Sequence, residues 1–461
     1  MSVATIASQV RAGRVTAAET IARTLAALEN CRDLNAVTHL HADRARARAE
    51  DIDRQVGTGK DPGPLAGVPF AVKNLFDVAG QITRAGSRAT GRNAPADRDA
   101  FAIRSLEAAG AILIASTNMD ELAYGFAGEN AHDGDTRNPR DPALSAGGSS
   151  SGSSALVAAG AVPLALGTDT NGSVRVPTAL SGVAGLKPTY GRLSRSGVTP
   201  FVRSLDHVGL FATDIHDLAL AYDALQARDH NDPVQAPRPL EPAAPGVDTS
   251  MTIRTARLNG YFDAPLHPDV RTVTDMAAQA LEARGPITLD LAEAARAASF
   301  ILTTAEGGQH HLPGLITHPD RFGPLVRDRL RAGALVPAAW TARAQKLRRR
   351  VTRQLAALMR DHDILLAPAT PCPACPLGTA EWEVAGVTLP IRLAIGMFTQ
   401  ALTLTGVPIA VLGQKGATSG LPVGVQIIGR PFEEATVLRA ARRLEQAGFG
   451  MAPQMPEAIH A

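Results

Sequence analysis

Two serines and one lysine are the residues whose types and surroundings could do chemistry. Lys73 lies in "VPFAVKNLFDV", Ser149 in "SAGGSSSGSSA" and Ser173 in "GTDTNGSVR". A serine hydroxyl is a weak nucleophile until a base takes its proton. Burial in an apolar strand lowers the pKa of a lysine, so its neutral amine can accept a proton near neutral pH. The alternative for Lys73 is a structural lysine whose amine reaches water from a strand end.

Other bases and a nucleotide site have weaker support. The twelve histidines show no triad spacing, and His310 and His311 are expected to be structural or exposed. Ser145–Ala155 has the small residues of a phosphate-binding loop, but Ser153 follows Gly152 where a P-loop requires lysine. On these residues alone, a nucleotide-binding loop and a plain flexible loop remain open.

The cysteines do not indicate a metal or redox site. Cys372 and Cys375 form a CxxC between prolines, "PCPACP", and Cys31 is the remaining cysteine. A zinc site needs about four ligands, and a redox CxxC usually opens a helix, so we predict a surface loop here. Because His, Asp, Glu and Cys ligands do not cluster, no metal and no cofactor are expected.

Composition excludes some classes of partner. The chain has 461 residues, 45% of them hydrophobic, and a net charge of +2. This balance gives no reason to expect a nucleic-acid or membrane surface. The start, "MSVATIASQVRAGRV", lacks a signal-peptide core, and no apolar run reaches the length of a membrane span. We therefore expect a cytoplasmic protein.

The elements around these residues predict an α/β fold. Residues 1–58 read as helices, with a capping box at Thr16–Glu19. Short apolar strands alternate with helices over 60–215 and return over 360–445. The stretch of about 216–360 is helix-rich. This alternation predicts one domain over 1–461, with a catalytic core of mainly parallel sheet and a helical insertion.

Several long motifs, in order, resemble the amidase signature family. They are "GPLAGVPFAVKNLFDVAG", "STNMDELAYG", "NPRDPALSAGGSSSGSS", "GTDTNGSVRVPTALSGVAGLKPTYGRLSRSGV" and "LPVGVQIIGRPFEEATVLRAARRLE". The resemblance covers about 60–215 and 360–445. It implies an amidase-signature fold, in which helices cover both faces of a twisted mixed, mainly parallel sheet. It also implies metal-free hydrolysis of an amide.

Carried over by position, the family's Ser–cisSer–Lys triad falls on Ser173, Ser149 and Lys73. The resemblance places the oxyanion hole on the backbone N–H groups of Thr170, Asn171, Gly172 and Ser173. A tight turn of small residues lets consecutive N–H donors converge on one oxygen. The implied mechanism passes a proton from Ser173 through Ser149 to neutral Lys73, and it predicts an alkaline-shifted pH optimum.

Four residues near the triad lead to expectations of their own. Many family members have glycine where this chain has Asn171 and Ser151. Asparagine tolerates positive φ better than most residues, so the turn should survive, and its side chain could narrow the site or add a hydrogen bond. Asp169 and Arg175 flank the turn and are expected to pair as its scaffold.

The resemblance also suggests a substrate class. The acyl pocket falls on Ala123, Tyr124, Gly125 and Phe126, and Arg329 is the candidate to bind a substrate carboxylate. The motifs look most like the branch that acts in s-triazine (cyanuric acid) breakdown, on a small carboxylated ureide such as 1-carboxybiuret, with release of ammonia. The alternatives are an allophanate or general amide hydrolase and the glutaminase subunit of a tRNA-dependent amidotransferase. A non-catalytic scaffold is disfavoured because the triad is intact. We expect a homodimer that carries a small helical companion subunit.

Overall fold

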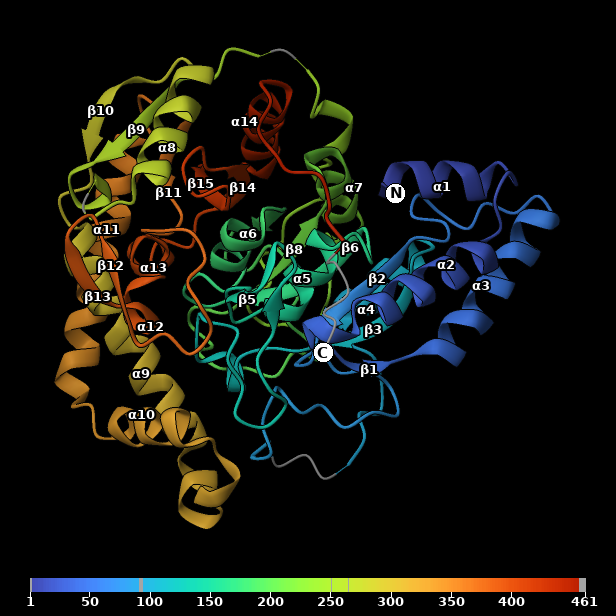
Figure 1. The fold of residues 1–461 in the computed structure, drawn as a ribbon, viewed down its shortest axis with the longest axis horizontal. Coiled ribbons are helices and arrows are strands. Elements are labelled where there is room, and N and C mark those ends of the chain that lie inside the picture. Colours follow the sequence, from blue (N-terminus) through green and yellow to red (C-terminus); the bar gives the residue numbers. More distant parts are fainter. Residues whose placement is uncertain (1, 91–93, 250, 264, 456–461) are drawn as a thin grey trace.

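The computed structural model describes residues 2–90, 94–249, 251–263 and 265–455. These residues form an eleven-stranded sheet at the centre of the molecule (Figure 1). In order across the sheet, the strands are β1 (Val37–Leu40), β3 (Ile112–Thr117), β2 (Pro69–Lys73), β6 (Leu164–Asp169), β8 (His207–Ala212), β7 (Ala184–Lys187), β14 (Ile409–Lys415), β15 (Pro422–Ile428), β11 (Ile364–Pro368), β9 (Thr255–Asn259) and β10 (Arg284–Thr288).

Strand direction divides the sheet into three parts. The neighbours β3, β2 and β6 run parallel, as do β11, β9 and β10. Between these groups, β6, β8, β7, β14, β15 and β11 pair antiparallel, and β1 runs antiparallel to β3 at one edge. The predicted mixed α/β sheet is confirmed, and its parallel neighbours are those two flanking groups. Antiparallel neighbours need no helical crossover, and β14 and β15 are joined by the short segment 416–421.

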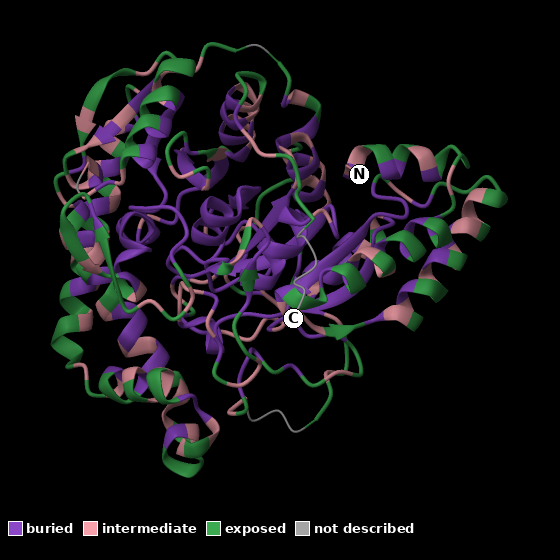
Figure 2. Cartoon of the chain, in the orientation of Figure 1, coloured by how far each residue is buried: buried purple, intermediate pink, exposed green. Residues whose placement is uncertain are grey.

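The N-terminal helices project to one side of the sheet (Figure 1). They are α1 (Val3–Arg11), α2 (Ala17–Asn30) and α3 (Ala42–Gly57). The predicted capping box at Thr16 and Glu19 is confirmed at the start of α2. Ile21 and Leu28 of α2 face the core, and the outer faces of these helices are exposed (Figure 2).

Helices cover both faces of the sheet. In chain order after α3 they are α4 (Phe101–Ala108), α5 (Ser151–Ala158), α6 (Arg175–Ser181), α7 (Ile215–Leu225), α8 (Pro268–Ala280), α9 (Ala292–Thr317), α10 (Pro324–Ala334), α11 (Ala338–Leu358), α12 (Ile391–Ala394), α13 (Met397–Thr403) and α14 (Glu434–Gln446). Short 3-10 turns lie at η1 (Arg32–Leu34), η2 (Glu121–Ala123), η3 (Ala244–Gly246), η4 (Gly260–Asp263) and η5 (Pro319–Arg321). Two small hairpins are β4 (Arg137–Asn138) with β5 (Asp141–Ser145) and β12 (Glu381–Val384) with β13 (Val387–Pro390).

The segment 216–360 is mostly helical but also extends the sheet. Helix α9 packs against α10, α11 and α13, at the end of the molecule opposite the N-terminal helices (Figure 1). The same segment contributes β9 and β10, which pair with β11 and with each other. These strands have polar positions, such as half-buried Arg257 and exposed Arg284, so their sequence lacks the apolar run of a central strand.

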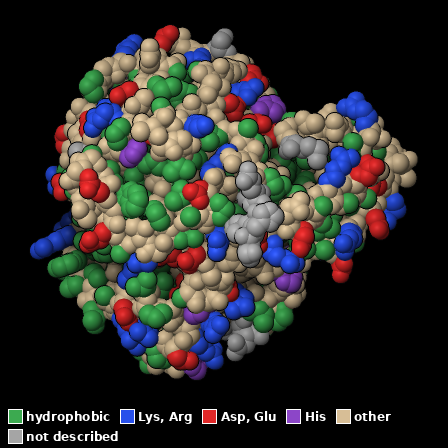
Figure 3. Space-filling model, viewed as in Figure 1, with side chains coloured by type: hydrophobic (Ala, Val, Ile, Leu, Met, Phe, Trp, Pro, Cys, Tyr) green, Lys and Arg blue, Asp and Glu red, His purple; other side chains and the backbone are tan. Residues whose placement is uncertain are grey.

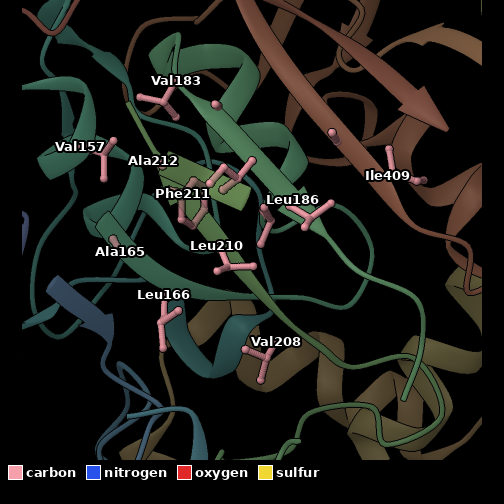
Figure 4. Close-up of a cluster of buried hydrophobic side chains, with 14 of the residues drawn as sticks. Val157, Ala165, Leu166, Val183, Leu186, Val208, Leu210, Phe211, Ala212 and Ile409 are labelled. Atoms are coloured by element: carbon pink, nitrogen blue, oxygen red, sulfur yellow. The ribbon is translucent and has the colours of Figure 1, made fainter. Parts of the chain in front are cut away.

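The core is built from the apolar strands of the sheet and the helices on them. Figure 4 shows buried side chains of α5, β6, β7, β8 and β14, with Leu166, Leu186 and Leu210 on one face of the sheet and Phe211 on the other. Basic and acidic side chains are interspersed on the face drawn in Figure 3. Within the described residues, none of the helices has both the length and the apolarity to cross a bilayer.

Candidate active site

The parallel strands bring the lysine to one edge of the sheet. Lys73 is the last residue of β2, and it lies in register with Thr117 at the end of β3. The next strand, β6, runs parallel to β2 and ends at Asp169, just before the turn that carries Ser173. The carboxyl ends of parallel strands share one edge, which is where α/β proteins usually place their sites.

Lys73 and Ser149 are in direct contact. The Lys73 amine donates to Ser149 Oγ at 2.7 Å and to Thr168 Oγ1 at 3.0 Å. Lys73 and Ser149 are fully buried, and Ser173 is 2% exposed. The peptide bond between Gly148 and Ser149 is cis. The alternative of a lysine that reaches water from the strand end is wrong, because the amine has no solvent exposure.

Ser150 joins the serine loop to the turn. Its backbone N–H donates to the Ser173 carbonyl at 3.3 Å, and its hydroxyl donates to the Thr168 carbonyl at 3.2 Å. The helix α5 begins at the next residue, Ser151. Ser150 therefore links the loop that carries Ser149 to the turn that carries Ser173, although the two serines are 24 residues apart in the sequence.

Burial makes Lys73 a candidate base. Loss of solvent lowers the pKa of Lys73 to about 7, although the carboxyl groups of Asp120, Asp169 and Asp206 act in the opposite direction. A pKa in this range leaves a large neutral fraction of the amine at physiological pH. A neutral amine that already contacts a serine hydroxyl can take its proton.

Asp169 organises the turn that follows β6. Its carboxylate accepts hydrogen bonds from the backbone N–H groups of Gly172 at 2.8 Å and Val174 at 3.2 Å. It also pairs with the Arg175 guanidinium at 2.9 Å, and both side chains are fully buried. The predicted pairing is confirmed. Burial opposes ionisation of Asp169, but Arg175 and its hydrogen bonds keep the pKa of this carboxyl well below its usual range.

The turn presents free donors next to the Ser173 hydroxyl. Gly172 has φ of 141°, and a Cβ there would lie 2.2 Å from Thr399 Oγ1, so glycine is required. Because the Gly172 N–H is used by Asp169, the unpaired backbone donors among the described residues of this turn are those of Thr170, Asn171 and Ser173. Such a group of N–H donors can stabilise an oxyanion.

The two departures from the family pattern both make hydrogen bonds. Ser151 donates to Thr136 Oγ1 at 2.9 Å. The positive φ of this turn is at Gly172 and not at Asn171. The tolerance of asparagine for positive φ is therefore not what preserves the turn. The Asn171 side chain adds hydrogen bonds to Ser299 and Thr303 of α9.

Three of the predicted pocket residues and Arg329 line one large cavity. It has a volume of about 790 Å³, and Tyr124, Gly125, Phe126 and Arg329 all lie in its wall. The Arg329 guanidinium donates to the Tyr124 carbonyl at 2.8 Å and lies 3.7 Å from the centre of the Tyr124 ring. Ala123 instead lines a smaller polar cavity of about 240 Å³, with Thr168 and Thr170. Neither cavity has Lys73, Ser149 or Ser173 in its wall.

Asp120 and Thr168 belong to the site and were not predicted. Asp120 is buried beside Ser149: its backbone N–H donates to the Ser149 carbonyl at 3.3 Å, and a Cβ on Gly148 would lie 2.0 Å from its carboxylate. Burial raises the pKa of Asp120 to about 7. Asp120 could have been predicted, because it is an acidic residue at the end of the apolar run "ILIASTNM". Thr168 could not, because it is one of many threonines in the predicted strands.

The remaining candidates lie away from this centre. His310 is exposed and His311 half-buried against Phe201, in agreement with a structural role. Cys372 and Cys375 lie in a loop as predicted, but the surface location is wrong: both thiols are buried, 3.7 Å apart, in a cluster with Val176 and Leu180. Among the described residues, no three His, Cys, Asp or Glu side chains are placed to hold a metal ion.

Comparison with known proteins places this chain in a family. The profile of the Amidase family matches residues 19–438, and the chain belongs to that family. The chain is 45% identical over 452 residues to AtzE, a 1-carboxybiuret hydrolase subunit of Pseudomonas sp. (strain ADP), covering 97% of this chain and 99% of that protein. It is 35% identical to a glutamyl-tRNA(Gln) amidotransferase subunit of Chloroflexus aurantiacus (strain ATCC 29366 / DSM 635 / J-10-fl), covering 95% of each chain.

Solved structures agree with the sequence relatives. An inhibitor-bound structure, described as a vestigial protein complex that reveals the origins of an s-triazine catabolic enzyme, superposes with a TM-score of 0.96. Its sequence is 44% identical, and the alignment covers 98% of this chain and 99% of that one. The predicted resemblance is confirmed: the chain is an amidase-signature amidohydrolase, acting on the C–N bonds of amides, and is closely related to 1-carboxybiuret hydrolase.

Proposed function

We propose that this enzyme hydrolyses the amide C–N bond of a small, linear, carboxylated ureide such as 1-carboxybiuret and releases ammonia. The observation that carries the chemistry is the 2.7 Å contact between the buried amine of Lys73 and Ser149, beside a turn with unpaired N–H donors. The substrate class is supported by the 45% identity to a 1-carboxybiuret hydrolase subunit.

The proposed mechanism passes protons along Ser173, Ser149 and Lys73, and it starts from the observed contact between Lys73 and Ser149. Neutral Lys73 accepts a proton from Ser149, and Ser149 accepts one from Ser173 as Ser173 Oγ attacks the amide carbonyl carbon. The N–H groups of Thr170, Asn171 and Ser173 stabilise the oxyanion. Ser149 then donates its proton to the departing nitrogen as the C–N bond breaks, with Lys73 supplying the proton in turn. Ammonia leaves, and Ser173 carries the acyl group.

Deacylation follows the same path. Water gives its proton through Ser149 to Lys73 and attacks the acyl carbon. The bond to Ser173 Oγ breaks, and the proton returns to this oxygen, so the enzyme is regenerated. No residue outside the three side chains and the turn is needed to move a proton.

Arg329 is proposed to bind the carboxylate of the substrate. Within the described part of the chain, its guanidinium has no acidic partner, and it faces the cavity of about 790 Å³. A cation without a counter-ion beside a cavity favours an anionic ligand. The Tyr124 ring beneath it fixes the plane of the guanidinium, and Tyr124 and Gly125 form the adjoining wall, as proposed for the acyl pocket.

The glutaminase alternative has less support. Identity to the amidotransferase subunit is 35%, compared with 45% for the carboxybiuret hydrolase subunit, over similar coverage. A general amide hydrolase would not need an unpaired arginine in the cavity. We further propose that residues 1–461 act as one amidase-signature domain, with 216–360 as an insertion. A homodimer with a small companion subunit, in the cytoplasm, remains a prediction, supported by a relative that is itself a subunit.

A substrate panel tests this proposal. Ammonia release would be measured on 1-carboxybiuret generated in situ, and on biuret, allophanate, glutamine and a simple amide such as butyramide. We expect release from 1-carboxybiuret at least about 100-fold faster than from glutamine, a difference of about 2.8 kcal/mol in transition-state binding. Release mainly from glutamine would contradict the proposal and favour the amidotransferase branch.

A further inference from the structure

Asn171 connects the catalytic turn to a helix far away in the sequence. Ser299 donates to Asn171 Oδ1 at 2.6 Å, and Asn171 Nδ2 donates to Thr303 Oγ1 at 2.6 Å. Both partners belong to α9, and their four-residue spacing places them on one face of that helix. All three side chains are buried, with Asn171 5%, Ser299 0% and Thr303 4% exposed.

The backbone of Asn171 is held as firmly as its side chain. Thr399 donates to the Asn171 carbonyl oxygen at 2.7 Å. On the next residue, the N–H of Gly172 is held by Asp169 at 2.8 Å. The peptide unit between these two residues is therefore bonded at both its oxygen and its N–H. The N–H of Asn171 has no partner among the described residues, and Thr170 is held separately by the bond of its hydroxyl to Asp206 at 2.6 Å. The side-chain contacts with α9 therefore hold the residue that carries this free donor.

We propose that Asn171 is a positioning residue, and that its hydrogen bonds to Ser299 and Thr303 fix the oxyanion donors beside Ser173. This inference rests on the proposed function, because it assigns those donors to the oxyanion of the acylation step. Donors held in place before the reaction stabilise the transition state without reorganisation. We name the three side chains the α9 clamp.

The α9 clamp also links the donors to the large cavity. Phe300 of α9 lies in the cavity wall, and Thr304 of α9 accepts a hydrogen bond from Tyr124 Oη at 3.5 Å. Phe300 directly follows Ser299 along α9, and Thr304 directly follows Thr303. A shift of α9 away from the turn would therefore move the donors relative to the cavity wall. Loss of the clamp should lower kcat more than it raises KM, because substrate contacts in the cavity remain.

The test compares variants that keep every backbone N–H. Asn171→Gly removes the side chain but leaves the oxyanion donors, and Ser299→Ala and Thr303→Val remove its partners with less change to the turn. Thr274→Val is the matched control, since Thr274 is a fully buried helical threonine of α8 whose hydroxyl bonds only Val270 of its own helix. Melting temperatures would confirm that each variant is folded.

Two readouts separate this inference from the identity of the substrate. The first is kcat and KM for ammonia release from 1-carboxybiuret. The second is the rate at which a fluorophosphonate labels Ser173, where Ser173 Oγ bonds to phosphorus, fluoride leaves and the phosphoryl oxygen occupies the oxyanion position. The labelling step needs no amide substrate, so it still measures the donors if the proposed substrate is wrong.

We expect Asn171→Gly and the double variant Ser299→Ala/Thr303→Val each to lower kcat and the labelling rate by about tenfold, less than the loss of a whole donor. KM should change less than about threefold, and Ser299→Ala should add little to Asn171→Gly because the clamp acts as a unit. The control should retain the wild-type rates. The inference would be overturned if the fluorophosphonate labelled Ser173 of the folded clamp variants within about twofold of the wild-type rate.

Discussion

At the scale of single residues, the proposed chemistry depends on the protonation state of Lys73. Its amine lies 2.7 Å from Ser149 Oγ, and burial lowers its pKa to about 7. Only the neutral amine can accept the serine proton. In the proposed mechanism, protonation of Lys73 below this pKa therefore removes the base and stops acylation.

The first prediction is the pH dependence of the reaction. Because the neutral form is active, kcat/KM should be constant at alkaline pH and fall about tenfold per pH unit below a midpoint near 7. The profile would be recorded from pH 5 to 10 in buffers of constant ionic strength. A profile that stays flat to pH 5 would contradict a lysine base.

Two variants test which group causes the fall in kcat/KM at acid pH. Ionised Asp120 raises the pKa of Lys73 through its charge, and the pKa values of both groups lie near 7. Asp120→Asn should therefore move the midpoint to lower pH and leave Lys73 as the group that titrates. Lys187 is a second buried lysine whose pKa burial lowers to about 7, but it donates to the carbonyls of Pro188 and Val407, away from the serines. Lys187→Met should therefore leave the midpoint unchanged; a shift equal to that of Asp120→Asn would argue against Lys73 as the titrating base.

At the scale of elements, the turn between β6 and α6 depends on one buried ion pair. Arg175 bonds Asp169 and also donates to the carbonyl of Thr399 at 2.9 Å and to Gln426 at 3.1 Å. The pair thereby joins β6, α6, α13 and β15. Removal of one partner leaves an uncompensated buried charge, which is costly.

The second prediction is the stability of variants in this pair. Arg175→Met should lower the free energy of unfolding by about 3–5 kcal/mol, because Asp169 stays buried without its partner. The control is Arg46→Met on α3, where the pair with Asp43 is exposed, and its loss should cost less than about 1 kcal/mol. Urea denaturation followed by circular dichroism measures both. Equal midpoints for the two variants would show that the buried pair does not stabilise the turn.

Local patterns predicted the elements that carry the site better than they predicted what those elements touch. The apolar run around Lys73 forms β2, the run "AGAILIASTNM" contains β3, and the run "AVPLALGT" contains β6. These strands are recognisable because a fully buried strand is apolar along its whole length. Strands β9 and β10 have no such run, so their segment reads as part of a helical insertion. The contact of Asn171 with Ser299 spans 128 residues, and no local spacing encodes a contact between segments so far apart.

At the scale of the whole molecule, the large cavity forms where separate parts of the chain meet. Its wall includes Tyr124 and Gly125 after β3, Phe300 of α9, Arg329 of α10 and Arg392 of α12. The Arg392 guanidinium is paired with Glu129 at 2.7 Å, whereas Arg329 has no acidic partner among the described residues. The two arginines therefore differ in the charge they offer to a substrate.

The third prediction concerns this difference. Arg329→Gln should raise KM for 1-carboxybiuret about tenfold or more, because a charge-assisted hydrogen bond contributes about 1.5–3 kcal/mol. KM for the uncharged relative biuret should stay nearly constant. Arg392→Gln is the matched control in the same wall, and its effect should be small for both substrates, since Glu129 already balances its charge. Equal increases for biuret and 1-carboxybiuret in Arg329→Gln would rule out carboxylate recognition by this residue.

The measurement that tests the central claim most directly is ammonia release from 1-carboxybiuret by the wild type and by Ser173→Ala. Ser173 is buried two residues before α6, and its hydroxyl has no hydrogen-bond partner among the described residues, so its removal should leave the fold and the melting temperature intact. The account predicts a loss of at least about 1,000-fold in kcat, since the nucleophile of the acyl-enzyme is gone. A folded Ser173→Ala enzyme that releases ammonia at the wild-type rate would contradict it.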